Sequence, residues 1–313
     1  MEIFRKMSFA DSTGDAIPFY HEGKYHIFSL TSPPGTTVYP ERLRTTWSHS
    51  ISDDLVHWQE LPTALYPGEG DEPDASGVWT GSVIYGEGQY HAFYTGYCLT
   101  AEFQQTICHA TSDDGITWTK DIANPVITPM TELYEKLDWR DPYVFYNEED
   151  ENYWILISAR RLDMPVTRRG CIVLYRSKNL KDWTYYGSIY SPGHTNCPEC
   201  PEMYKMGGHW YLSYSRFSEF VNTIYRVSES PFGPWRKPKK DGIGGRRFYA
   251  AKSMQNDDGR RFYFGWAHDR AEQSDKGEWY WGGTFCIPHE VVPTENGAVS
   301  YTHLRAHETV LDL

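Results

Sequence analysis

The sequence predicts an all-β protein, specifically a five-bladed β-propeller with four-stranded antiparallel blades around a central funnel. The first observation is a tag that starts with Ser and ends with Trp, and that recurs with nearly constant spacing. Its four copies occupy residues 52–58, 112–118, 177–183 and 228–235. The second observation is that each tag follows strands rich in aromatic residues, while helical periodicity is almost absent.

The tags divide the chain into units of the size of a propeller blade. Successive tag tryptophans lie 60, 65 and 52 residues apart. A fifth, less regular unit starts near residue 246, continues through the strand 261–266 and closes over residues 281–288. A β-sandwich is the competing architecture, but it does not require a repeated tag. We expect the tag tryptophans to pack the blades, and these are Trp58, Trp118, Trp183 and Trp235.

Composition limits the classes of partner. The net charge of −12 argues against nucleic acid and anionic membranes, which require clustered Lys and Arg. No apolar run reaches the roughly 20 residues of a membrane span, and residues 1–9 show no secretory signal, so we expect a cytoplasmic protein with reduced thiols. The aromatic fraction of 16% suits surfaces on which sugars stack.

Three carboxylates open strands at matched places in the repeat. An aromatic strand follows Asp15 after 10 residues, Asp141 after 12 and Glu199 after 11, and Trp79 holds the corresponding place in the second unit. First strands of a propeller line its axis, so these side chains are expected to converge. Mutual repulsion raises at least one carboxyl pKa, which provides the acid and the carboxylate that glycoside hydrolysis needs.

These residues also carry a family resemblance. The segments Arg140-Asp141-Pro142 and Glu199-Cys200-Pro201 resemble signatures of glycoside hydrolase family 32, the group of invertases, levanases and inulinases. Matches at residues 47–58, 79–82, 248–250 and 265–266 extend the resemblance from about residue 14 to 292. It implies a small-molecule or oligosaccharide substrate, a retaining mechanism on a five-bladed propeller, and no metal or other cofactor.

The resemblance implies a role for each carboxylate. Asp15 would be the nucleophile, Glu199 the acid and base, and Asp141 the residue that holds ring hydroxyls and stabilises the transition state, with Arg140 supporting it. Apart from the resemblance, Glu202 is expected either to orient Glu199 or to be a surface acid. Further residues are expected to contact the sugar: Trp47, Trp79, Thr80, Tyr249 and Trp281.

Several alternatives stay open at this point. The first family motif usually reads Asn-Asp-Pro-Asn-Gly, whereas this chain has Thr13-Gly14-Asp15-Ala16-Ile17, so Asp11 is a second candidate nucleophile. Cys197-Pro-Glu-Cys200 imitates a zinc or redox motif, but no second pair of cysteines has this spacing. An arabinofuranosidase of a related propeller family, or a non-catalytic carbohydrate-binding propeller, would share much of the pattern.

The C-terminus has a different character. From about residue 299 the sequence fits no blade pattern and resembles a translated sequencing adapter. We therefore expect a propeller over residues 1–298 and a non-native tail over 299–313, without the C-terminal β-sandwich that many family members carry.

Overall fold

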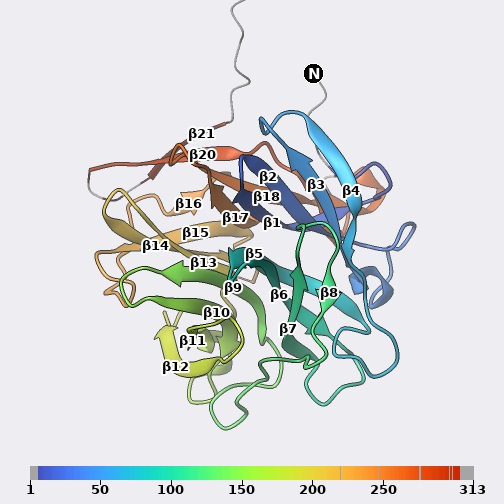
Figure 1. Cartoon of the computed structure of the whole chain (residues 1–313), viewed down its shortest axis with the longest axis horizontal. Helices are drawn as coiled ribbons and strands as arrows, with labels where there is room; N and C mark the ends of the chain where they lie inside the picture. Colours follow the sequence, from blue (N-terminus) through green and yellow to red (C-terminus); the bar gives the residue numbers. More distant parts are fainter. Residues whose placement is uncertain are drawn as a thin grey trace, which may run out of the picture.

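The computed structural model describes residues 6–303 except residues 219, 246, 275, 296 and 298. Its strands form five antiparallel blades whose first strands gather near the centre of the molecule (Figure 1). Blade I contains β1 (Thr13–His21), β2 (Lys24–Thr31), β3 (Thr46–Ser52) and β4 (Trp58–Leu65). Blade II contains β5 (Gly77–Gly86), β6 (Gln89–Tyr97), β7 (Gln105–Ser112) and β8 (Thr119–Lys120).

The remaining blades follow in chain order around the ring (Figure 1). Blade III contains β9 (Arg140–Asn147), β10 (Asn152–Arg160), β11 (Gly170–Ser177) and β12 (Thr184–Tyr190). Blade IV contains β13 (Glu199–Met206), β14 (His209–Arg216), β15 (Asn222–Ser228) and β16 (Gly242–Ile243). Blade V contains β17 (Tyr249–Gln255), β18 (Arg261–Arg270), β19 (Trp279–Phe285), β20 (His289–Pro293) and β21 (Val299–His303). The short 3-10 turns are η1 (Glu41–Leu43), η2 (Val166–Arg168) and η3 (Ala271–Gln273).

The five-bladed, all-β prediction is confirmed, and blade V closes the ring. Its strands β19 and β20 both pair with β18, so together they act as one interrupted third strand. A bridge between Thr13 and Gly283 joins β19 to β1 of blade I. Strand β21 pairs with β20 and forms the outer edge, five residues beyond the boundary drawn from the sequence at 298. That the tail is non-native stays a prediction, and residues 304–313 lie outside the described residues.

The recurring tag is a hydrogen-bonded turn followed by a packing residue. In the first copy, Ser52 Oγ accepts the backbone N–H of Leu55 at 2.9 Å, and the Asp54 carboxylate accepts the next two N–H groups. Leu55 has a φ of 66°, and Gly115 and Leu180 take the same left-handed conformation in the next two copies. Ser and Asp favour such local turns because their side chains bond to nearby backbone.

Three of the tag tryptophans pack against the second strand of the preceding blade, and Trp235 packs against the core cluster that contains Trp154 and Leu156. The ring of Trp118 meets Phe28 of β2 edge-on at 5.7 Å, and Trp183 meets Phe93 of β6 at 5.3 Å. Trp58 closes the circle against Phe264 of β18 at 6.4 Å. The packing role predicted for these three tryptophans is confirmed, and edge-to-face geometry is the arrangement that aromatic quadrupoles favour.

All five first strands carry the same β-bulge. Between two successive paired positions, the first strand advances by three residues while the second strand advances by only two. The bulged segments span residues 13–16, 78–81, 140–143, 199–202 and 249–252. A bulge bends its strand and redirects side chains, and these five bulges lie where the first strands face the axis.

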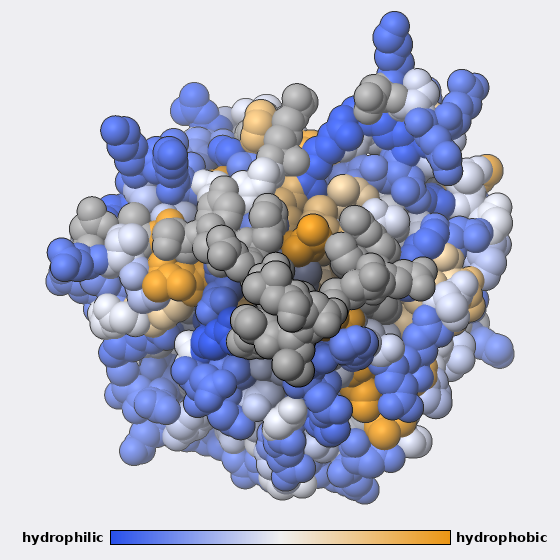
Figure 2. Space-filling model, turned by 90° about the horizontal axis from the view of Figure 1, so that it is seen from above, coloured by the Kyte–Doolittle hydropathy of each residue, from blue (hydrophilic) through white to orange (hydrophobic). Residues whose placement is uncertain are grey.

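The side of the molecule seen in Figure 2 is mostly hydrophilic. Figure 2 shows the side of the molecule that carries β20, where the apolar patches are small and separate. Among the described residues, no helix has the length and apolar character needed to cross a membrane.

Candidate active site

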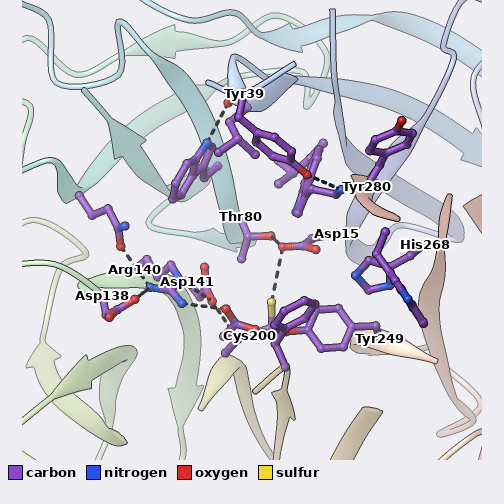
Figure 3. Close-up of a pocket in the computed structure, with 18 residues that line it drawn as sticks. Asp15, Tyr39, Thr80, Asp138, Arg140, Asp141, Cys200, Tyr249, His268 and Tyr280 are labelled. Carbon is purple, nitrogen blue, oxygen red and sulfur yellow. Dashed lines mark hydrogen bonds and ion pairs between the residues drawn. The ribbon is translucent and has the colours of Figure 1, made fainter. Parts of the chain in front are cut away.

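A cavity of about 390 Å³ occupies the funnel, and every blade contributes to it (Figure 3). Every bulge contributes at least one lining residue, among them Asp15, Thr80, Asp141, Glu199 and Tyr249. The structure therefore brings together the three carboxylates that the sequence singled out.

The three carboxylates occupy different positions within their bulges, which corrects the prediction that their positions are equivalent. We call residues with the same position in their bulges a layer. Glu199 is the first residue of its bulge, Asp141 the second and Asp15 the third. Glu199 accepts hydrogen bonds from residues of its own layer, because Arg140 and Tyr249 are also the first residues of their bulges. The carboxylates therefore meet different partners, and their electrostatic environments differ.

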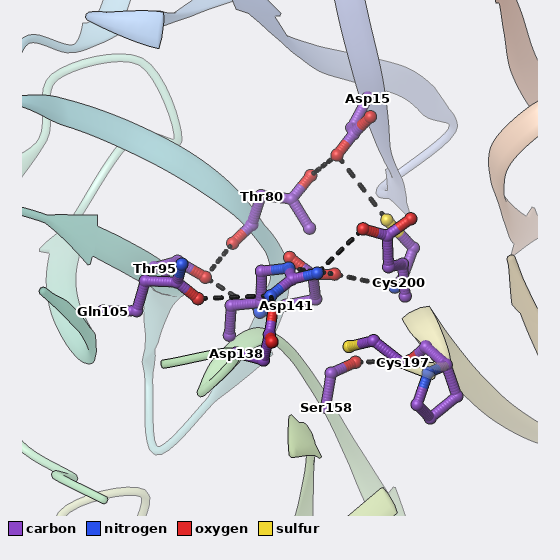
Figure 4. A network of polar contacts seen from close by, with 12 residues as sticks. Asp15, Thr80, Thr95, Gln105, Asp138, Asp141, Ser158, Cys197 and Cys200 are labelled. Atoms are coloured by element: carbon purple, nitrogen blue, oxygen red, sulfur yellow. Dashed lines mark hydrogen bonds and ion pairs between the residues drawn. The ribbon is translucent and has the colours of Figure 1, made fainter. Parts of the chain in front are cut away.

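Asp15 is a buried carboxylate surrounded by donors (Figure 4). Thr80 Oγ1 donates to its Oδ2 at 2.7 Å, and Trp266 Nε1 donates to its Oδ1 at 2.8 Å. The Cys200 thiol lies 3.5 Å from Oδ2. Burial and the charge of Asp141 raise the Asp15 pKa, and Thr80, Lys252 and Trp266 oppose the rise. The two oxygens are thus fixed in orientation before any substrate binds.

Asp141 sits in a strained part of the backbone. Its φ of 60° is unusual for a residue other than Gly, and its N–H donates to Thr95 Oγ1 at 2.8 Å. Its Oδ2 accepts the backbone N–H of Cys200 at 2.8 Å and lies 3.7 Å from Arg140 Nε. These contacts tie blade III to blade IV and hold the carboxylate on the cavity wall (Figure 4).

Glu199 is the carboxylate most suited to carry a proton near neutral pH. Arg140 Nη2 donates to its Oε1 at 2.8 Å, and the Tyr249 hydroxyl donates to its Oε2. Burial raises the pKa of Glu199 to about 7; Arg140 lowers it, and the charges of Asp141 and Asp15 raise it. Arg140 also donates to Asp138, so its charge is shared with other acids. Asp138 is therefore a site residue that the sequence reasoning missed, although it stands two places before the Arg-Asp-Pro signature.

The aromatic walls explain the unusual first motif. A Cβ at Gly14 would lie 2.4 Å from the ring of Trp281, so only glycine fits beside Asp15. Trp281 lines the cavity, and its backbone N–H donates to the Tyr39 hydroxyl at 2.7 Å. Trp79 also lines it and stacks on Tyr97 at 4.0 Å.

Two predicted roles need correction. Trp47 is fully buried and does not line the cavity; its Nε1 donates to the backbone oxygen of Trp79 at 2.9 Å, so it supports the wall instead of contacting sugar. Glu202 is buried outside the cavity and accepts the Ser253 N–H at 3.0 Å and hydroxyl at 2.8 Å, so it anchors blade V to blade IV. The alternative nucleophile Asp11 also lies outside the cavity and accepts the Gly35 N–H.

The thiols and the loops complete the site. Cys197 and Cys200 are unbridged and buried, and the described residues contain no group of three or more potential ligands arranged to hold a metal ion. Residues outside the bulges finish the lining, and the sequence reasoning missed them because they lie in loops or near the ends of strands other than the first strand of a blade. They include Tyr39, Gln105, Phe217, His268, Trp279 and Tyr280.

Comparison with protein families decides the family. A family model described as the N-terminal domain of glycosyl hydrolases family 32 matches residues 15–302. The chain belongs to this family. The levanase of Bacillus subtilis is 30% identical over 324 residues, covering 93% of this chain and 45% of the levanase. A sucrose-6-phosphate hydrolase of Zymomonas mobilis is 26% identical over 304 residues, covering 90% of this chain and 57% of that protein. The chain thus spans about half the length of these family 32 relatives.

Solved structures show the same fold. Fructan 1-exohydrolase IIa from Cichorium intybus superposes with a TM-score of 0.77 at 22% identity, covering 97% of this chain and 60% of that one. A family 32 β-fructofuranosidase from Bombyx mori superposes with a TM-score of 0.74 at 24% identity, covering 93% of this chain and 62% of that one. The first of these proteins has also been solved as a variant with 1-kestose, and a variant of the second with sucrose.

Proposed function

We propose that this chain carries the active site of a retaining glycoside hydrolase that removes β-D-fructofuranosyl units from sucrose or fructans. The observation that carries the proposal is the contrast between two carboxyl groups in one cavity. Burial raises the pKa of Glu199 to about 7, so it can hold a proton, while Thr80 and Trp266 donate to the two oxygens of Asp15 and oppose the rise in its pKa. Retaining glycosidases need this division between an acid and a nucleophile.

In the first step, an Asp15 oxygen attacks the anomeric carbon of the fructosyl unit as the glycosidic bond breaks. Glu199 donates its proton to the leaving oxygen, so the leaving group departs as a neutral alcohol. Asp141 also lines the cavity, where its carboxylate can accept hydrogen bonds from ring hydroxyls and offset developing positive charge. Arg140 and Tyr249 hold both oxygens of Glu199 in place.

The second step follows from the electrostatics of the first. The Asp15 charge raises the Glu199 pKa, and bonding to the fructosyl unit removes that charge. The pKa of Glu199 therefore falls once the covalent intermediate forms, which suits it to take a proton from water. The activated water opens the ester at Asp15 and releases fructose with its original configuration.

The relatives support a fructoside as the substrate class. Those named above are a levanase and a sucrose-6-phosphate hydrolase, and a raffinose invertase from Escherichia coli is 29% identical over 297 residues. Membership of family 32 favours this class over an arabinofuranoside, and a lectin would not require an acid paired with a nucleophile.

The test is release of free fructose from sucrose, inulin and levan by the protein and by its Asp15→Asn and Glu199→Gln variants. We expect release from at least one substrate, and a loss of at least a thousandfold in Asp15→Asn. No release from any of the three, by protein with an intact fold, would refute the proposal. If the Asp15→Asn variant still released fructose, the nucleophile would have to be another residue.

A further inference from the structure

Lys252 is a buried cation without a carboxylate at contact distance. The residue is only 1% exposed, and it forms no ion pair with any carboxylate among the described residues. Its ammonium group donates to the backbone oxygen of Gly81. Moving a charged group out of water costs free energy, which proteins usually recover by pairing it with an opposite charge. The place of this lysine in the fold therefore calls for an explanation.

The bulges bring Lys252 beside the proposed nucleophile. Lys252 is the fourth residue of the blade V bulge, and its partner Gly81 is the fourth residue of the blade II bulge. Blade I lies between these two blades, and its fourth residue is Ala16, which directly follows Asp15. Ala16 is fully buried and carries only a methyl group, so the lysine can extend past it towards blade II. The positive charge of Lys252 opposes the rise that burial causes in the Asp15 pKa.

Lys252 acts from behind the wall of the active cavity. It does not line that cavity, but it lines a smaller one of about 170 Å³ together with Gly81. Asp15 lines the active cavity and not the smaller one. A sugar in the active cavity therefore meets Asp15 directly, whereas the charge of Lys252 reaches the reaction through Asp15.

The other ionisable residues around Lys252 are neutral or paired. Among the described residues, those that share the smaller cavity or the fourth layer with it are Tyr20, Tyr143, Glu202 and Arg261. Burial raises the pKa of Tyr143, and a hydrogen bond to an aspartate raises that of Tyr20, so both hydroxyls are neutral at pH 7. Glu202 lies 3.8 Å from Arg261. The charge of Lys252 is thus left to act on Asp15.

The ionisable residues around Asp15 provide no competing cation. Asp141 and Glu199 lie 3.7 Å and 2.8 Å from Arg140, so one guanidinium group serves both of these carboxyl groups. Burial raises the pKa of the Cys200 thiol well above its usual value, so this neighbour is neutral. Asp15 itself forms no ion pair with any described residue. Asp15 and Lys252 are therefore two buried groups of opposite charge, each without a closer ionic partner.

We propose that Lys252 is a positioning residue that stabilises the Asp15 carboxylate as it leaves the fructosyl unit in the second step. This inference rests on the proposed function, because it takes Asp15 as the nucleophile. In that step a water oxygen bonds to the anomeric carbon, and the bond from this carbon to Asp15 breaks. The electron pair of the broken bond returns to the carboxylate, and the water proton passes to Glu199.

The sign of the effect differs between the two steps. A fixed cation behind Asp15 favours the return of negative charge to this carboxylate, so it speeds the opening of the covalent intermediate. The same cation opposes the first step, in which Asp15 loses its charge. Removal of the positive charge should therefore slow the second step without slowing the first.

Infrared titration of the substrate-free protein tests the electrostatic part without any turnover. The difference spectrum between each protein and its Asp15→Asn counterpart isolates the Asp15 carboxylate band. In Lys252→Met and Lys252→Gln, Asp15 should titrate at a higher pH than in the parent protein, because the charge that opposes the rise in its pKa is gone. Lys239→Met removes one charge from an exposed position and serves as the matched control. An unchanged Asp15 titration in both Lys252 variants would overturn the inference, whether or not the parent protein releases fructose.

Kinetics with a fructoside whose leaving group needs no protonation test the effect on the reaction. In both Lys252 variants kcat and KM should fall together by about tenfold or more, while kcat/KM, which reports the first step, does not fall. Mass spectrometry after a millisecond acid quench should find a larger fraction of protein with fructose on Asp15. A fall in kcat/KM without a larger adduct fraction would show a purely structural role. Parent-like kinetics in Lys252→Gln but not in Lys252→Met would assign the effect to the hydrogen bond with Gly81 and would also overturn the inference.

Discussion

The ionisation of Glu199 should set the alkaline limb of the pH–rate profile. Its pKa is about 7, against an ordinary value of 4.5, with burial as the main cause. At pH 9 only about 1% of such a group is protonated, so kcat/KM for sucrose should be about a hundredfold below its plateau. A carboxyl group with an ordinary pKa would be about 0.3% protonated at pH 7, which would cost most of the activity at that pH.

The assay is initial-rate fructose release from sucrose at subsaturating concentration, from pH 4 to pH 9. In Asp141→Asn the descending limb should move to lower pH, because the charge of Asp141 raises the Glu199 pKa. Asp113→Asn removes an equal charge from an exposed position and should leave the limb in place. A limb that stays near pH 7 in Asp141→Asn, or a profile that is flat to pH 9, would refute the reasoning.

Three further predictions concern the supports of the site and of the blades. Thr80→Val removes a 2.7 Å donor to the proposed nucleophile, so kcat/KM should fall roughly 10- to 150-fold while circular dichroism is unchanged; full activity would contradict the role given to this bond. Trp47→Phe removes a buried hydrogen bond to Trp79, so the free energy of unfolding in urea should fall by roughly 1–3 kcal/mol with little change in KM. A raised KM at unchanged stability would show instead that Trp47 contacts the sugar. His26 and His49 are buried and bonded at 3.0 Å, and burial lowers their pKa values to about 4 and about 3. The unfolded chain takes up protons from about pH 6.5 downward while the folded state excludes them, so stability should fall toward pH 4 by up to about 1.4 kcal/mol per pH unit for each histidine. In His49→Gln, the free energy of unfolding measured by urea titration should depend less steeply on pH. An unchanged dependence would contradict the role given to the two buried histidines.

The repeat could be predicted because its chemistry is local. A Ser-to-Trp tag contains its own turn, and the tryptophan that ends it has to pack on something apolar, so sequence spacing translates directly into blades. The convergence of Asp15, Asp141 and Glu199 followed from the same spacing.

The arrangement within the site could not be predicted in the same way. The layer to which each carboxylate belongs depends on bulge register, which is a property of strand pairing and leaves no mark in the spacing. Trp47 illustrates a second limit, because a tryptophan next to a sugar and one directly behind the wall give the same sequence signal. Trp279 is the first residue of β19, and its contact with Arg247 joins residues that are distant in sequence.

The most direct test of the central claim is mass spectrometry of the trapped intermediate. The Glu199→Gln variant would be mixed with a fructoside whose leaving group needs no protonation, quenched in acid within milliseconds and digested. The account predicts one fructosyl group on the peptide that contains Asp15, with fragment ions that place it on that residue. A fructosyl group on Asp11 or another residue, or turnover without any adduct and with inverted configuration, would contradict it.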